Sequence, residues 1–240
     1  MGSEKNISAV LLVVCPIVVF AMYFTLLSTV GDADWSDIKG VTLLLGQDSS
    51  NIGIGMAIVT VAMGLMFASY GYVRSTMTGG SGAGLANIGF VLIVGMFAAF
   101  LIENGLIAAA ADSSSTGQAA GAAAPAAAVA AGDAANAEAI GAATASAAGV
   151  SIGATLFVAS QGIGTIGTIT GFLGFLLIGL SMIIQKNWNI IVAILLIITG
   201  LLGTVGTPII GYDSDTMFIV WVSMMVTISV TGVFTYLREE

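Results

Sequence analysis

The sequence predicts an all-α membrane protein, a polytopic bundle of six transmembrane helices, from two observations. Of its 240 residues, 58% are hydrophobic and only 8% are charged, whereas a soluble domain carries roughly 25% charged residues. The apolar residues also gather in six stretches, each long enough to cross ~30 Å of hydrocarbon, which takes ~20 helical residues. The stretches do not alternate as barrel strands do, and a helix satisfies its own backbone hydrogen bonds in lipid.

The six helices are expected at residues 7–30, 52–73, 85–110, 165–184, 190–210 and 217–237. The first follows Lys5, as the core of a secretion signal would, but its apolar length of ~23 residues exceeds the ~7–15 of such a core. Pro208 is expected to kink or end the fifth helix. Residues 1–110 therefore hold helices 1–3, residues 111–162 form a connection, and residues 163–240 hold helices 4–6.

The connection differs in composition from the rest of the chain, with 23 alanines between Ala108 and Val150. Alanine is the best helix former, so parts of it could be helical. Pro125 and several glycines are expected to interrupt a long helix, and few large apolar residues are present to build a core. A mobile linker therefore stays open as the alternative. Residues 150–158 are again apolar, so either the fourth helix projects from the membrane or residues 151–161 form a short interfacial or re-entrant piece.

Basic residues predict the orientation. With a cytoplasmic N-terminus, four of the five basic residues fall on the cytoplasmic side, and only Lys39 falls outside. Basic residues near helix ends mark cytoplasmic segments. Both termini are therefore expected in the cytoplasm and the Ala-rich connection outside. The low charge and the acidic outer loops fit a prokaryotic plasma membrane.

The residue types that the sequence lacks exclude most metal and nucleophile chemistry. The chain has no histidine, which removes His-ligated metals and haem and the Ser-His-Asp nucleophile. Its single cysteine, Cys15, cannot form an intramolecular disulfide. With five basic residues and 13 acidic ones, the chain has no basic surface of the kind that binds nucleic acid. We expect no catalytic residue, no metal ligand and no cofactor, and thus no enzyme.

Small residues recur every three to four positions in the second, fourth and fifth helices. Such stripes let two membrane helices approach closely. Their structural interpretation is tight packing, and their functional one is a ring of subunits or a pore. The candidate packing residues are Gly53, Ala57, Gly64, Gly71, Gly164, Gly167, Gly171, Gly174, Gly200, Gly203 and Thr207.

Glu103 is the carboxylate within the third predicted helix, and intramembrane carboxylates are costly and often functional. It lies ~18 residues after Leu85, or ~27 Å along the helix and close to the outer interface. Asn104 and Gly105 are typical of a helix end, where Glu103 would reach water. A solvated or packing role and an ion- or proton-binding role with Asn104 both stay open.

Residues 51–110 resemble the membrane rotor subunits of rotary ATPases. Those proteins pair a Gly-rich helix with a second helix that carries one carboxylate, and a polar loop joins the two. Here Asn51-Ile-Gly-Ile-Gly leads through Arg74 and a Gly-rich loop at residues 79–84 to Glu103. The fifth and sixth helices carry no corresponding carboxylate, and the first helix is additional, so the resemblance stops at this fragment.

These patterns predict a non-catalytic integral membrane subunit that packs through its small-residue helix faces into a larger assembly. Its partners would be the lipid bilayer and other membrane subunits or copies of itself, and no nucleic acid. The alternative is a transporter or ion-translocating subunit that uses Glu103 and the Gly/Thr-rich fourth and fifth helices.

Overall fold

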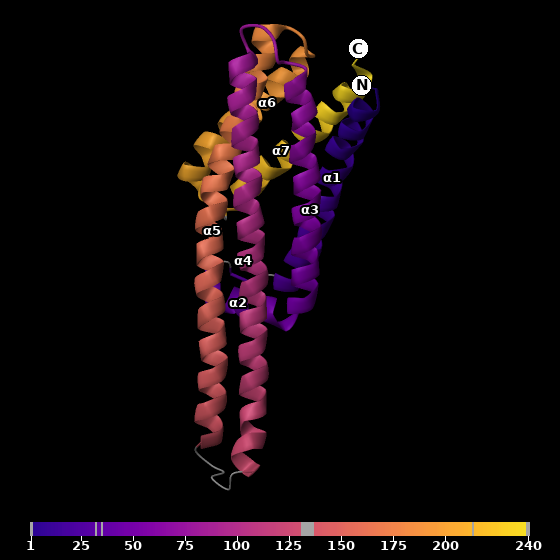
Figure 1. Cartoon of the computed structure of the whole chain (residues 1–240). Coiled ribbons are helices and arrows are strands. Elements are labelled where there is room, and N and C mark those ends of the chain that lie inside the picture. Colours follow the sequence, from indigo (N-terminus) through magenta and orange to yellow (C-terminus); the bar gives the residue numbers. More distant parts are fainter. Residues whose placement is uncertain (1, 32, 35, 131–136, 213, 239–240) are drawn as a thin grey trace. The chain divides into compact units, whose positions relative to one another are not determined.

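The computed structural model describes residues 2–31, 33–34, 36–130, 137–212 and 214–238, and all regular structure among them is helical (Figure 1). Six helices are long and apolar enough to cross a membrane, so the chain is a multi-pass membrane protein. In order, the helices are α1 Gly2–Val30, α2 Ile38–Gln47, α3 Ser49–Ser75, α4 Ala83–Ala130, α5 Ala137–Gln185, α6 Ile190–Ile210 and α7 Asp215–Leu237.

Each expected span lies within one helix, in order α1, α3, α4, α5, α6 and α7, and α6 has the expected limits. Its limits follow from local chemistry, because the Asn189 side chain accepts a hydrogen bond from the Ile191 N–H and Gly211 ends the helix at φ +93°. Pro208 does not end α6, which continues to Ile210. The short helix α2 was not expected, since its ten residues are too few to span a bilayer.

The Ala-rich connection is helical in its described residues. Helix α4 has 48 residues and continues past Pro125, and α5 has 49 residues. The expected interruption at Pro125 is therefore wrong, and so is a separate helix at residues 151–161, which belong to α5. The high helix propensity of alanine explains this outcome. The tip of the connection, residues 131–136, lies outside the described residues.

The chain divides into two compact units, of which unit 1 comprises Met1–Ala21, Ile58–Leu101 and Gly162–Glu240. Its core is a cluster of aromatic rings with centroid distances of 5.2–6.4 Å, formed by Phe67, Tyr70, Phe100, Phe172, Phe175 and Trp221. The two ends of the chain lie together (Figure 1), where Lys5 Nζ donates to the Arg238 carbonyl at 2.9 Å.

Glycines bring the helices of unit 1 into backbone contact. A Cβ added at Gly89 would lie 2.7 Å from the Gly174 carbonyl oxygen, and one at Gly174 would lie 2.6 Å from the Gly89 oxygen. A Cβ at Gly200 would lie 2.7 Å from the Phe172 oxygen. Helices α4 and α5, and α5 and α6, therefore approach closely at positions where glycine has no side chain.

Unit 2 comprises Met22–Ala57 and Ile102–Gln161. Its core joins the end of α1, all of α2, the start of α3 and the adjoining parts of α4 and α5, through Leu26, Val30, Val41, Leu45, Ile52, Met56, Ile107, Ala110, Ala111 and Phe157. In it α4 and α5 run antiparallel and side by side (Figure 1). They touch where a Cβ on Gly117 would lie 2.7 Å from the Gly149 Cα. Helix α2 lies against this pair, where Gln118 Nε2 donates to the Leu43 carbonyl at 3.2 Å.

Candidate functional site

Glu103 lies in the interior of α4 and is buried in unit 2. Its side chain is 3% exposed, and that of Asn104 is 2% exposed. The expected helix end at Asn104 and Gly105 is wrong, because α4 continues for a further 25 residues to Ala130. The carboxyl group is therefore packed inside the protein rather than open to water.

The pairing of α4 with α5 identifies the residue opposite Glu103. A Cβ on Gly153 of α5 would lie 2.7 Å from the Ala110 carbonyl of α4, so these two residues face each other. Seven residues are about two helical turns. Glu103 lies seven residues before Ala110 and Ser160 seven after Gly153, so the two share this face of the antiparallel pair. Ser160 is fully buried, in agreement with this register.

The Ser160 hydroxyl donates to the Phe157 carbonyl at 2.7 Å, which leaves its oxygen lone pairs able to accept. Helix α1 adds a fourth polar group, because Tyr23 lies within electrostatic range of Glu103. Three helices of unit 2 thus bring a carboxyl, an amide and two hydroxyl groups to one region, which we call the Glu103 cluster (Glu103, Asn104, Ser160 and Tyr23).

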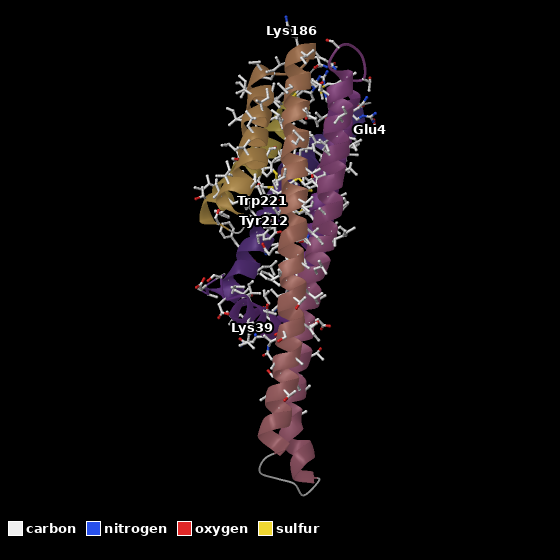
Figure 2. The ribbon with its side chains drawn as sticks, turned by 90° about the vertical axis from the view of Figure 1, so that its left-hand side faces the viewer. Glu4, Lys39, Lys186, Tyr212 and Trp221 are labelled. Atoms are coloured by element: carbon white, nitrogen blue, oxygen red, sulfur yellow. The ribbon has the colours of Figure 1, made fainter. Side chains whose placement is uncertain are left out.

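The single basic residue in the sequence of unit 2 is Lys39, which is exposed on α2 (Figure 2). No basic side chain is therefore buried with Glu103 in this unit. A buried carboxyl group is stable when it holds a proton, or when a cation shares its oxygens. Both states are compatible with ion or proton binding, and neither supplies a nucleophile or a redox centre.

Sequence reasoning placed Glu103 and Asn104 but missed Ser160 and Tyr23. Ser160 belongs to the stretch between the expected third and fourth spans, and its proximity to Glu103 depends on the register of two helices that are far apart in sequence. The seven-residue spacing of Glu103 and Ala110, matched by that of Gly153 and Ser160, is the signal that could have identified it.

Most of the predicted packing residues are used inside the chain. A Cβ on Gly64 would lie 2.9 Å from the Phe97 ring, and one on Gly71 3.6 Å from the Phe90 ring. Those on Gly167, Gly171 and Gly203 would overlap Ala99, Met96 and Phe172, and Gly164 is buried. Thr207 is 2% exposed and donates to the Gly203 carbonyl at 2.6 Å.

Two of the predicted packing residues face outward instead, and both belong to the unit 2 part of α3. Nothing lies within 4 Å of a Cβ built on Gly53, and Ala57 is exposed. Their neighbour Ile54 is 60% exposed. This outward face of α3 (Gly53, Ile54 and Ala57) is free to pack against lipid or another helix.

Comparison of the chain with protein-family models, with curated proteins and with solved structures found no match.

Proposed function

We propose that this chain is a non-catalytic integral membrane subunit that packs into a larger membrane protein assembly. The observation that carries the proposal is the length of α4 and α5. They have 48 and 49 residues, whereas ~20 residues cross a bilayer. More than half of each helix therefore extends beyond the hydrocarbon. Following the basic residues, we place this extension outside the cell, in a prokaryote, with both termini in the cytoplasm.

The surface of the extension supports contact with another protein. From residue 108 to residue 161 the charged residues are Asp112, Asp133 and Glu138, whereas a soluble surface carries roughly 25–35% charged residues. Exposed side chains in its described part are mostly small, and Ile152 and Val158 are more than half exposed. Water solvates a surface with so few charged groups poorly, whereas a second small-residue helix packs well against it.

The outward face of α3 is a second candidate contact. Neighbouring helices of this chain already cover the predicted packing glycines Gly167, Gly171, Gly174, Gly200 and Gly203. Among the predicted packing residues, Gly53 and Ala57 on this face of α3 are therefore the ones left for a partner.

The test is gentle detergent extraction from the native cell, followed by sizing and mass spectrometry of the proteins that co-migrate. A fixed set of other membrane proteins, or a homo-oligomer, supports the assembly role, and a lone monomer overturns it. Gly53→Leu is expected to weaken the association. Gly162→Leu is the matched control, because a Cβ there also meets nothing within 4 Å and the fold has room for either change.

The Glu103 cluster favours a second candidate, a transporter or ion-translocating subunit in which Glu103 and the Gly/Thr-rich α5 and α6 serve the path. The burial of Glu103 with Asn104 and Ser160 supports it, because intramembrane carboxylates mark ion and proton pathways. Within unit 1, the buried Thr168 hydroxyl of α5 makes no hydrogen bond, which leaves a polar group for a moving ion or water.

Flux of Na⁺ or H⁺ into liposomes that hold the purified chain tests this candidate. Transport by the wild type, its loss in Glu103→Gln and its retention in Asp112→Asn would support it. Asp112 is the matched control, because it is an exposed carboxylate on the same helix. Absence of flux from the wild type, with assembly of Glu103→Gln unchanged, would reject this candidate and leave the assembly role.

A further inference from the structure

One end of unit 1 holds a cavity beside the last turn of α7. Its volume is about 340 Å³, and the residues that line it come from the loop between α5 and α6 and from the end of α7: Asn187, Trp188, Asn189, Phe234, Leu237 and Arg238. Lys186 adjoins these residues at the same end of α5 (Figure 2). Tyr212 and Trp221 lie at the other end of α6 and α7 in the same view.

Arg238 is held in place at this cavity, but one nitrogen of its guanidinium group makes no hydrogen bond. Its guanidinium carbon lies 5.0 Å from the centroid of the Trp188 ring. That ring is fixed because Trp188 Nε1 donates to the Thr76 hydroxyl at 2.9 Å. Arg238 Nη1 is buried and makes no hydrogen bond. A guanidinium carries five N–H donors, and a buried unsatisfied donor is unfavourable, so an acceptor bound against Nη1 would stabilise this end.

Two basic side chains also lie at this end of unit 1. Lys5 Nζ donates to the Arg238 carbonyl at 2.9 Å, which brings a second cation close to Arg238. No acidic side chain among the described residues forms an ion pair with either of them. Helix α6 begins at the cavity after Asn189, and the partial positive charge of a helix N-terminus attracts anions.

Asn187 presents a buried acceptor, rather than a donor, that lacks a hydrogen bond. Its Nδ2 donates to the Thr76 carbonyl at 2.8 Å, which fixes the amide. Its Oδ1 is buried and accepts no hydrogen bond. A ligand that satisfies the cavity thus needs an anionic acceptor for Arg238 and a neutral donor for Asn187. A phosphodiester that bears a hydroxyl group has both.

We propose that this cavity binds the headgroup of an anionic phospholipid, with its phosphate on Arg238 and a headgroup hydroxyl donating to Asn187. Helices α6 and α7 have 21 and 23 residues, the length of one bilayer crossing, so their ends lie at headgroup depth. Trp188 is a residue type enriched at that depth. Phe234 and the 63% exposed Leu237 provide an apolar wall for the glycerol backbone and acyl chains, which a free phosphate would not use.

Native mass spectrometry of the purified full chain tests the proposal, with phosphatidylglycerol, phosphatidylcholine or phosphatidylethanol added at equal concentration. Phosphatidylethanol is anionic but lacks the headgroup hydroxyl. We expect the wild type to retain phosphatidylglycerol about fivefold more than phosphatidylcholine, with phosphatidylethanol between the two. Arg238→Gln should lower the retention of phosphatidylglycerol to that of phosphatidylcholine.

Arg74→Gln is the control, because Arg74 Nε already donates to Asn87 Oδ1 at 2.6 Å and its guanidinium stacks on the Phe90 ring. Circular dichroism confirms that each variant is folded. If Arg238→Gln does not fold, Lys5→Gln is expected to lower the retention of phosphatidylglycerol by removing the neighbouring cation.

Equal retention of phosphatidylglycerol and phosphatidylcholine by the wild type would overturn the proposal, as would equal losses in Arg238→Gln and Arg74→Gln. Inorganic phosphate at millimolar concentration is the remaining probe. If it raises the melting temperature and no phosphatidylglycerol adduct forms, the site takes free phosphate and the lipid assignment is wrong.

Discussion

Alanine at Gly174 and alanine at Gly162 are the same substitution in the same helix, with opposite expected effects on stability. Both glycines lie in α5 and in unit 1. Replacement of glycine by alanine in a helix stabilises it by about 1 kcal/mol, because alanine loses less backbone entropy. That gain is common to the two variants, so the difference between them isolates the contact made by the added methyl group.

The structure gives the size of that contact. At Gly162 the methyl group meets nothing within 4 Å. At Gly174 it would lie 2.6 Å from the Gly89 carbonyl oxygen, 2.9 Å from Ile93 Cγ1 and 3.1 Å from the Ile93 nitrogen. Since backbone atoms cannot rotate away, α4 and α5 must separate by at least about 0.4 Å, and overpacking of this kind costs about 1–3 kcal/mol.

We therefore expect Gly162→Ala to raise the free energy of unfolding by up to about 1 kcal/mol. Gly174→Ala should lower it by about 0–2 kcal/mol, which leaves a difference of about 1–3 kcal/mol between the variants. Equilibrium unfolding of the purified chain in mixed micelles, with SDS as the denaturant and circular dichroism as the signal, measures both. Equal stability of the two variants, or Gly174→Ala as the more stable one, would refute the backbone contact between α4 and α5.

Three further predictions follow from single contacts. The Thr199 and Thr227 hydroxyls share a buried hydrogen bond of 2.8 Å, so a valine double-mutant cycle should show a coupling energy of about 0.5–1 kcal/mol, and additive effects would contradict it. In Gly46→Val the added Cβ would lie 2.6 Å from Ser114 Oγ of α4, so the substitution should release α2 from the α4–α5 pair. Hydrogen exchange should then rise in α2 and stay unchanged in α6 and α7. The hydroxyl and backbone N–H of Ser36 bond the Asp34 carboxylate and hold its pKa below the ordinary value. This stabilisation is present above about pH 4 and is lost as the pH falls through the lowered pKa; an NMR titration should show that pKa rise in Ser36→Ala.

The six membrane-spanning helices could be predicted because lipid imposes a local rule on sequence. A helix that crosses hydrocarbon needs about 20 apolar residues, whatever it packs against. For α6 even the limits could be predicted, because a polar N-cap at Asn189 and a glycine at position 211 bound the apolar run. Helix α2 also begins at a polar N-cap, Asp37, but its ten residues are too few for a membrane span, and contacts with α4 hold it in place.

The helical structure of the Ala-rich extension could not be predicted in the same way, because its stability depends on pairing with a helix that is distant in sequence. Gly117 and Gly149 lie 32 residues apart in sequence, and their close approach appears only when two helices pair. Glu103 illustrates the same limit. Its place along the third span could be predicted, but its burial depends on α5, and its proximity to Ser160 on the register between the two helices.

That register restricts how the extension can change in length during evolution. Within unit 2, the turns of α4 and α5 are matched step by step, because Ala110 lies opposite Gly153 and Gly121 lies opposite Ala142, eleven residues further along each helix. A deletion in one helix alone would rotate every later contact and bring side chains where glycines are needed. Related proteins should therefore lengthen or shorten both helices together, by about seven residues each, or about 10 Å of reach at a time.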